Sequence, residues 1–236
     1  MTEPLLEAVD VARTYRGPTD IPAVRGVSLA LRPGDLVALL GPSGSGKSTF
    51  LGMLAGLDEP DEGEVRWQGR PFATMSAEDR RAVHQREIGI VFQAYGLLPS
   101  LSAVENVALP LRVRGEVRQS REAATAMLER LDLRDRLEHR TFELSGGQQQ
   151  RIAVARALVG QPTVVLADEP ISEVDEANGE RILAALWEVA SRGGAVVVAT
   201  HDPQAIDYAT RAMLLRDGRV EAEGDPAELR ASLTTD

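Results

Sequence analysis

The sequence contains no cysteine, and only one of its 26 basic residues is a lysine, Lys47. Without cysteine, the chain has neither a disulfide framework nor a thiolate metal site. The shortage of lysine, together with only two asparagines, fits a G+C-rich codon bias, because both amino acids use codons that begin with AA. Against that bias, the surviving lysine marks a position where a compact point charge serves better than the planar fork of arginine.

Long apolar runs and a surplus of basic charge are also missing. The longest apolar runs are short pieces such as AVVVAT at 195–200, far below the roughly 20 residues that a membrane-spanning helix needs. The first residues, MTEPLLEAVD, lack the basic and then apolar build of a signal peptide, so we expect a soluble chain without a leader. The net charge of −10 argues against broad binding of nucleic acid, whose phosphates require a basic face.

Short apolar segments alternate with helical patterns along the 236 residues, a length that suits one α/β domain. This alternation predicts a mainly parallel sheet covered by helices on both faces. A turn signal at Asp217-Gly218 predicts a hairpin over 211–224. The other predicted strands lie at 5–12, 23–31, 35–40, 63–69, 88–93, 163–170 and 194–201. Predicted helices lie at 47–57, 176–193 and 225–236, and residues 145–160 are predicted to form a loop followed by a helix.

One helical block interrupts this alternation. Residues 100–142 have helical spacing and belong to a block at about 94–158, which we interpret as an inserted lobe. We therefore expect a single domain, 1–236, whose core comprises 1–93 and 159–236.

The segment GPSGSGKS matches the phosphate-loop pattern G-x-x-x-x-G-K-[ST], with a predicted strand before it and a predicted helix after it. Its glycines let backbone N–H groups turn inward around phosphates, and the N-terminus of the next helix favours negative charge. Lys47 is expected to reach the β- and γ-phosphates of a nucleotide, and the Ser48 hydroxyl to bind Mg²⁺. The predicted nucleotide-binding residues of this loop are Gly41, Pro42, Ser43, Gly44, Ser45, Gly46, Lys47, Ser48 and Thr49.

Two carboxylates, Asp168 and Glu169, follow the apolar stretch TVVLA, at the end of a predicted strand where α/β sheets place their ligand sites. Neighbouring strand residues point to opposite sides, so the two need not share a role. We expect Asp168 to bind Mg²⁺, directly or through water, and Glu169 to polarise an attacking water. A purely structural pair is disfavoured, because burying two carboxylates for packing is costly.

Two further polar residues follow apolar strands: His201 comes after AVVVAT, and Gln93 comes after IGIVF. In these positions we expect His201 to contact a γ-phosphate oxygen and the neutral amide of Gln93 to contact both Mg²⁺ and water. By residue type alone, a structural histidine or a surface glutamine would be the ordinary interpretation.

The segment ELSGGQQQR at 143–151 resembles a second anion site, because Ser145 and two glycines lead into a helix. It has no lysine and no acidic base, so it cannot perform chemistry by itself. It is also a normal helix N-cap, with Ser145 as the cap and Gln148 three residues later, and the two interpretations are compatible.

The phosphate loop, Gln93, LSGGQ, VVLADEP and THD, in this order and spacing, resemble the ATP-binding subunits of ABC transporters over essentially the whole chain. The resemblance implies a P-loop NTPase fold of the ABC type, with a mainly parallel core, an antiparallel β subdomain and an inserted helical lobe. It implies an ATPase that uses ATP and Mg²⁺ and that pairs head to tail with a second subunit. The residues that would close over the γ-phosphate held by the other subunit are Ser145, Gly146, Gly147 and Gln148.

The resemblance also implies roles for single residues. Tyr15 would stack on adenine, and Glu169 would be the general base. His201 would sense the γ-phosphate, Gln93 would link Mg²⁺ to the helical lobe, and Asp175 would lie in the loop that crosses the dimer interface. The implied metal ligands are Ser48, Gln93 and Asp168.

Within the family, GPSGSGKST, LLPSLSAVENVALPL and LSGGQQQRIAVARAL look most like the lipoprotein-release, macrolide-export and cell-division group. This similarity implies three things: an integral membrane permease as partner, a second ATP-binding subunit (most simply an identical copy), and a cytoplasmic location beneath the membrane. Tyr95, Leu97 and Leu98 are either docking contacts for a coupling helix of the permease or part of the helical-lobe core. The sequence does not identify the transported substrate or the direction of transport.

One loop departs from the group's pattern. After the acidic pair the group has Thr, a small or Gly-Asn step, and Leu-Asp, whereas this chain has ISEVD, in which Ser172 and Asp175 are retained. Ile171, Glu173 and Val174 are unusual at their positions. We expect the added negative charge of Glu173 to slow closure of the dimer or to favour a non-identical partner.

A soluble ABC ATPase without a membrane partner, such as an iron–sulfur assembly type, is the alternative. DNA-repair members carry long coiled coils where this chain has a lobe of about 65 residues, and ribosome-acting members are usually tandem on one chain. A nucleotide kinase or a GTPase would explain the phosphate loop but not LSGGQ. The transporter interpretation accounts for all of these motifs.

Overall fold

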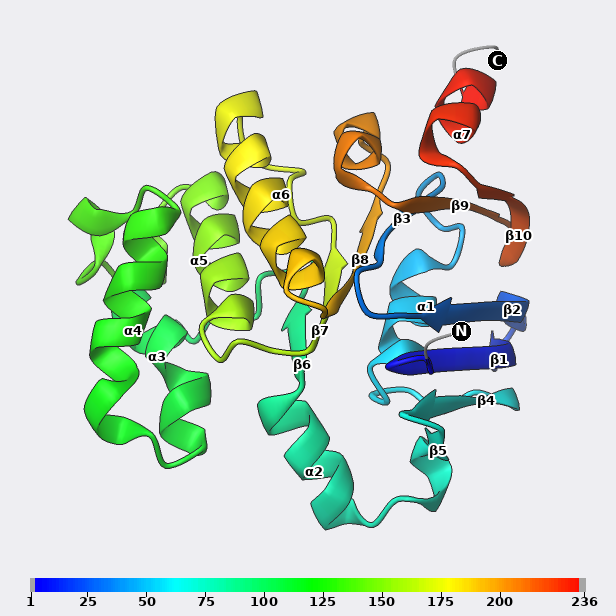
Figure 1. Ribbon diagram of the computed structural model, residues 1–236, viewed down its shortest axis with the longest axis horizontal. Coiled ribbons are helices and arrows are strands. Elements are labelled where there is room, and N and C mark those ends of the chain that lie inside the picture. Colours follow the sequence, from blue (N-terminus) through cyan, green and yellow to red (C-terminus); the bar gives the residue numbers. More distant parts are fainter. Residues whose placement is uncertain (1–2, 234–236) are drawn as a thin grey trace.

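The computed structural model describes residues 3–233 as two sheets with helices packed around them (Figure 1). The strands are β1 (Leu6–Tyr15), β2 (Ile21–Leu31), β3 (Leu36–Leu40), β4 (Glu62–Trp67), β5 (Arg70–Pro71), β6 (Ile88–Val91), β7 (Val164–Asp168), β8 (Ala195–Thr200), β9 (Arg211–Arg216) and β10 (Arg219–Gly224). The helices are α1 (Lys47–Leu54), α2 (Ala77–Arg86), α3 (Ala103–Val113), α4 (Val117–Arg130), α5 (Gly146–Leu158), α6 (Glu176–Ser191) and α7 (Pro226–Leu233). The predicted tail helix is confirmed as α7, although its last predicted residues, 234–236, lie outside the described residues.

The strands sort into an antiparallel sheet, β2-β1-β4-β5, and a mainly parallel sheet, β10-β9-β3-β8-β7-β6. In the second sheet β10 runs antiparallel to β9, because the turn at Asp217 and Gly218 brings the chain back beside it. Both turn residues have a positive φ, 50° and 76°, as a tight two-residue hairpin requires. The predicted parallel core, antiparallel subdomain and hairpin are therefore confirmed.

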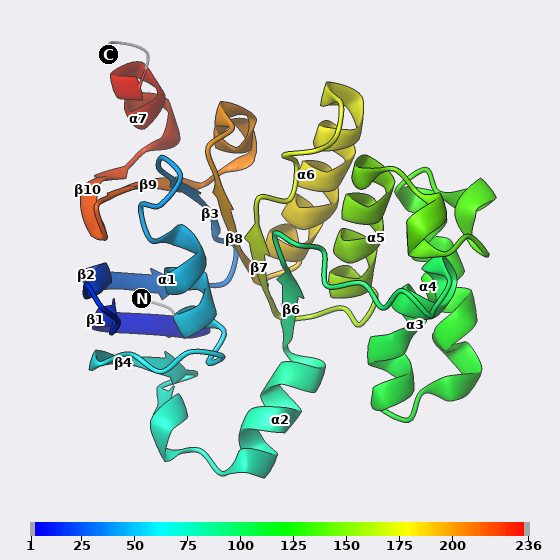
Figure 2. The same cartoon turned by 180° about the vertical axis from the view of Figure 1, so that it is seen from behind.

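Alternate residues of the parallel strands enter two different hydrophobic cores. On β8, Val196 and Val198 pack with residues of α3, α5 and α6, whereas Val197 and Ala199 pack with residues of α1 and the antiparallel sheet. Successive side chains of a strand point to opposite faces, so a strand covered on both faces must be apolar throughout. Figures 1 and 2 show α1 between the two sheets and α5 and α6 on the other face of the parallel sheet.

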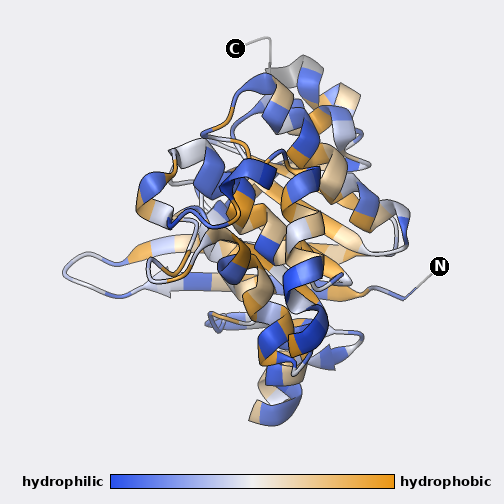
Figure 3. Ribbon diagram, turned by 90° about the vertical axis from the view of Figure 1, so that its left-hand side faces the viewer, coloured by the Kyte–Doolittle hydropathy of each residue, from blue (hydrophilic) through white to orange (hydrophobic). Residues whose placement is uncertain are grey.

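Helices α3 and α4 lie beyond α5, on the side away from the antiparallel sheet (Figure 1). Figure 3, viewed from that side, shows hydrophilic and hydrophobic residues alternating along the helices, with hydrophobic strands behind them. The prediction of helix over 100–142 is wrong at its C-terminal end, because α4 ends at Arg130 and the chain continues in short turns to Leu144. Asp132, with a φ of 58°, adopts a left-handed conformation that an α-helix cannot continue through.

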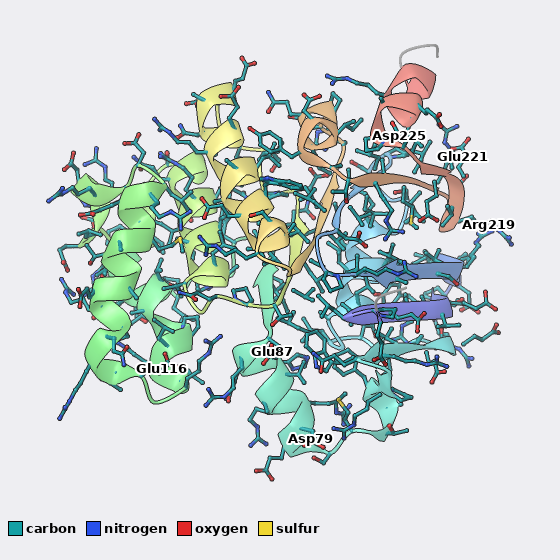
Figure 4. The ribbon with its side chains drawn as sticks, in the orientation of Figure 1. Asp79, Glu87, Glu116, Arg219, Glu221 and Asp225 are labelled. Carbon is teal, nitrogen blue, oxygen red and sulfur yellow. The ribbon has the colours of Figure 1, made fainter. Side chains whose placement is uncertain are left out.

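Helix α2 was not predicted. None of its residues is buried, so it lacks the apolar spacing on which the other helix predictions rest. The features that favour this helix lie at its two ends. At the start, the Ser76 hydroxyl accepts a hydrogen bond from the N–H of Asp79 at 3.0 Å, and basic residues occupy the last turn. Figure 4 shows Asp79 and Glu87 at opposite ends of this helix. Glu87 joins the helix to the sheet by accepting a hydrogen bond from the Thr163 hydroxyl at 2.5 Å.

Within residues 3–233, none of the helices combines the length and the apolar character that crossing a membrane would need.

Candidate functional site

The loop between β3 and α1 is shaped by glycines, and at Gly41 and Gly46 no side chain would fit. A β-carbon on Gly46 would lie 2.2 Å from the carbonyl oxygen of Ala23, and the residue has a φ of 103°. The loop folds around Lys47, which is 7% exposed and whose Nζ donates to the carbonyl oxygens of Gly41 at 2.7 Å and Pro42 at 3.2 Å. The ammonium group therefore lies on the concave side of the loop, where the phosphate-loop pattern predicts that phosphate oxygens bind.

The β9–β10 turn supports this loop from outside. Gly218 donates its N–H to the carbonyl of Ser45 at 3.0 Å and accepts from the N–H of Arg25 at 2.8 Å. A β-carbon at Gly218 would lie 2.7 Å from the carbonyl oxygen of Ala23, so the close approach requires glycine. The hairpin that the sequence predicted thus fixes the position of the phosphate loop.

Glu169 lies just after β7 and is 8% exposed. One carboxylate oxygen, Oε2, accepts a hydrogen bond from the Thr200 hydroxyl at 2.9 Å. The other, Oε1, lies 3.0 Å from Nδ1 of His201 and 4.0 Å from Nζ of Lys47. Its backbone has a φ of 48°, which turns the side chain back toward the end of β8. The structure therefore brings Lys47, Glu169 and His201 together from three elements distant in sequence.

Asp168, the last residue of β7, lines the same cavity as Lys47 and Glu169. Its Oδ1 is buried and has no hydrogen-bond partner among the described residues. Burial raises the pKa of Asp168; the charge of Glu169 raises it further, and the Ser48 hydroxyl and Lys47 offset this only in part. An unpaired buried carboxylate oxygen is a strong attractor for a cation.

A cavity of about 610 Å³ joins these residues. Among the predicted residues it is lined by Tyr15, Ser43, Gly44, Gly46, Lys47, Ser48, Thr49, Gln93, Asp168 and Glu169. Its wall also includes residues that the sequence analysis missed, namely Ile21, Pro22, Ala23, Arg25, Asp217 and Gly218. Of these residues, only Asp217 and Gly218 stood out in the sequence, as a turn. Because they are far from the phosphate loop in sequence, their contact with it could not be predicted. His201 is exposed and reaches the site through Glu169.

Tyr15 stands at the edge of this cavity, with 43% of the residue exposed. Its hydroxyl donates to Oδ2 of Asp58 at 3.0 Å, and the guanidinium carbon of Arg13 lies 5.4 Å from the centre of its ring. The ring is thus anchored at its tip and covered by a cation.

Ser145, Gly146, Gly147 and Gln148 form a second site apart from this cavity. The Ser145 hydroxyl accepts from the N–H of Gln148 at 3.3 Å, and the Gln148 side-chain oxygen accepts from the N–H of Ser145 at 3.0 Å. This reciprocal pair confirms the predicted N-cap of α5. A cavity of about 340 Å³ lies here, lined by Ser145, Gly146, Gly147, Gln148, Arg151, Glu173, Val174, Asp175 and Asn178. No phosphate-loop residue lines it.

Asp175 caps α6, because its Oδ1 accepts from the N–H of Asn178 at 2.9 Å. That hydrogen bond is the main reason why the pKa of Asp175 lies below its usual value. Across residues 3–233, no cluster of three or more His, Cys, Asp or Glu side chains could hold a metal ion. The predicted magnesium ligands are one carboxylate, one hydroxyl and one amide, so they would not be found as a cluster of His, Cys, Asp or Glu side chains.

The chain is similar to known proteins over nearly its full length. A family model described as ABC transporter matches residues 24–172. An uncharacterized ABC transporter ATP-binding protein from Thermotoga maritima is 43% identical over 92% of this chain and 94% of its own length. The lipoprotein-releasing system ATP-binding protein LolD 2 from Caulobacter vibrioides is 41% identical, over 94% of this chain and 99% of its own length.

The macrolide export ATP-binding/permease protein MacB from Syntrophobacter fumaroxidans is 42% identical over 93% of this chain, which spans only 31% of that relative's length. Among solved structures, the ATP-binding cassette MJ0796, dimeric in a post-hydrolysis state with ADP and Pi, matches with a TM-score of 0.88 at 37% identity. The match covers 94% of this chain and 98% of that one.

Proposed function

Because the chain belongs to the family of ABC transporter ATP-binding domains, we propose that it is the motor subunit that drives a separate membrane permease. As a member of this family it binds and hydrolyses ATP. The observation that carries the site assignment is the buried Glu169 carboxylate, held by Thr200 and His201 and 4.0 Å from the phosphate-loop lysine. Relatives named for macrolide export and lipoprotein release favour an export or mechanical-transmission partner.

In this proposal the ATP phosphates occupy the phosphate-loop cavity. Lys47 exchanges the carbonyls of Gly41 and Pro42 for phosphate oxygens, and its charge stabilises the transferring phosphoryl group. Tyr15, at the cavity edge, supplies the ring for the adenine. Glu169 orients the attacking water in line with the γ-phosphate, and His201 contacts both that carboxylate and the γ-phosphate.

The residues around Asp168 fit a magnesium ion. Asp168 offers a buried oxygen without a protein partner, and Ser48 and Gln93 line the same cavity with oxygen-bearing side chains. When bound with ATP, Mg²⁺ would neutralise charge on the phosphate oxygens. Gln93 also leads into the segment before α3, so it would relay the state of the site to the helical lobe, which we propose spans about 94–158.

We propose that each active site is completed by a second copy of the chain. The Ser145–Gln148 site lies in a separate cavity, which is what a head-to-tail pair requires, because each copy must present both halves. The dimeric MJ0796 cassettes support such pairing. Asp175, beside the Ser145 loop, would then lie at the dimer interface.

The permease contact is proposed for the segment after β6. Of the three candidate residues, Tyr95 and Leu97 pack against the hydrophobic core that the helical lobe shares with the parallel sheet, whereas Leu98 is 43% exposed. Phe92 is exposed to the same extent. We therefore assign the docking role to Leu98 and Phe92, and a packing role to the other two.

Affinity capture of the tagged Glu169→Gln variant tests this function. The variant would be isolated from detergent-solubilised host membranes with MgATP, with nucleotide-free samples as the control. A permease of few spans that co-purifies only with MgATP is the expected result. A permease of many spans would support the motor role but place the chain in another group of ABC transporters. Co-purification of soluble partners alone would favour the iron–sulfur assembly type.

A further inference from the structure

The carboxylate of Glu173 lies against the first glycine of the Ser145–Gln148 site. A β-carbon added to Gly146 would lie 2.2 Å from Oε2 of Glu173 and 3.3 Å from the hydroxyl of Tyr95. The backbone of Glu173 covers the next glycine as well, since a β-carbon on Gly147 would lie 2.6 Å from its carbonyl oxygen. Both glycines are therefore covered by a residue of their own chain.

Tyr95 holds this carboxylate in place. Its hydroxyl is hydrogen-bonded to Glu173, and burial together with this bond raises the pKa of Tyr95 to about 12, so the hydroxyl stays protonated and donates. The backbone of Tyr95 is itself fixed to α5, because Arg156 donates to the carbonyl oxygens of Tyr95 at 2.7 Å and Gly96 at 2.5 Å. The segment after Gln93, the loop at 171–175 and the start of α5 thus meet at one point.

The position of the carboxylate has an electrostatic consequence. The N-terminal end of a helix favours an anion, because its first N–H groups point outward and the helix dipole adds partial positive charge. Glu173 places a negative charge at the start of α5 within the resting chain. An incoming phosphate would meet a like charge beside Gly146.

We propose that Glu173 is an internal competitor of the γ-phosphate: its carboxylate, held by Tyr95, covers Gly146 until ATP on the second copy displaces it. This inference rests on the proposed composite site and concerns its regulation. Closure of the dimer must break the contact between Tyr95 and Glu173, so the pair raises the ATP concentration at which two copies associate. The phosphate loop of the same chain is unaffected, because neither residue lines its cavity.

The test measures dimer formation against ATP concentration by analytical ultracentrifugation, in the Glu169→Gln background that slows turnover. Glu173→Gln removes the charge and keeps the shape, and Tyr95→Phe removes the hydroxyl that holds it. We expect each to lower the ATP concentration for half-maximal dimerisation about three- to tenfold, the scale of a helix-terminus charge. Glu176→Gln is the matched control, since it removes one exposed charge in the first turn of α6 and should shift the midpoint less than about twofold.

A double variant separates this mechanism from a general effect on stability. If Tyr95 acts only through the charge of Glu173, Tyr95→Phe should add nothing once Glu173→Gln is present. Nucleotide affinity of the monomer, followed with a fluorescent ATP analogue, should be the same in all variants. A Glu173→Gln protein that needs as much ATP as the parent, or more, would overturn this inference alone. A parent that binds ATP and stays monomeric would overturn the composite site and this inference with it.

Discussion

The side-chain amide of Gln150, on α5, donates a hydrogen bond at 3.0 Å to the backbone carbonyl of Glu169. Gln150 is fully buried, and its own side-chain oxygen has no partner among the described residues. The bond therefore ties α5, the helix capped by Ser145, directly to the residue that we assign as the general base. It also supports a backbone whose φ of 48° is unfavourable for a glutamate.

From this contact we expect Gln150→Leu to lower kcat by about tenfold or more while KM for ATP stays within about twofold, because a small displacement of a catalytic group costs rate rather than binding. Steady-state ATPase kinetics would measure the split. Gln149→Leu is the matched control: this neighbour donates to the carbonyl of Leu144 instead, so its loss should spare kcat. Equal losses of kcat in the two variants would contradict a positioning role for Gln150.

Glu169→Gln should keep nucleotide binding and lose most turnover, by about a hundredfold or more. An amide still accepts the hydrogen bond from Thr200, so the local structure should persist while the carboxylate that we propose orients water is lost. Equilibrium ATP binding and phosphate release would be measured on the same preparation. Normal hydrolysis by this variant would show that the base lies elsewhere.

Replacing the only lysine, Lys47, by arginine tests whether the shape of its side chain matters as well as its charge. Lys47→Arg keeps the charge but places a planar fork where Nζ now lies between two carbonyl oxygens, 2.7 and 3.2 Å away, inside a buried loop. We expect ATP affinity to fall by about tenfold or more, as seen by calorimetric titration, with little change in Tm. An affinity like that of the parent would mean that Lys47 is retained for reasons other than its shape.

Features of the structure that depend on residues close in sequence could be predicted, whereas contacts between distant segments could not. The parallel strands were predictable because both of their faces are buried, so segments such as AVVVAT are apolar throughout. The phosphate-loop residues and the cap of α5 were predictable because each depends on neighbours close in sequence. The contact of Glu173 with Gly146 and Tyr95 was not predictable, because it joins three segments that only tertiary packing brings together.

Gly46→Ala tests the close approach that shapes the phosphate loop. The added methyl group would lie 2.2 Å from the carbonyl oxygen of Ala23 on a residue whose φ is 103°, so the backbone must shift. We expect the free energy of unfolding to fall by about 2 to 4 kcal/mol, measured by urea denaturation, and nucleotide binding to be lost. Gly34→Ala is the control: it also has a positive φ, of 92°, but nothing lies within 4 Å of its added methyl group. A similar loss of nucleotide binding in both variants would show that backbone strain, rather than contact with Ala23, decides the outcome.

Helix α2 offers a prediction that depends on its cap alone. None of its residues is fully buried, and Val83 and His84, which contact the rest of the molecule, lie in its last two turns. In its first turn, the hydrogen bond between the Ser76 hydroxyl and the N–H of Asp79 is the main local support. We expect Ser76→Ala to cost about 1 kcal/mol in the stability of this helix, seen as faster amide hydrogen exchange over residues 77–80. ATPase activity should stay at the parent level, because α2 contributes no residue to the phosphate-loop cavity.

Ser191→Ala is the control for this prediction. It removes a hydroxyl that donates to the carbonyl of Glu188 near the end of α6, so it should leave exchange in α2 unchanged. Unchanged exchange over residues 77–80 in Ser76→Ala itself would mean that contacts other than the cap hold the helix.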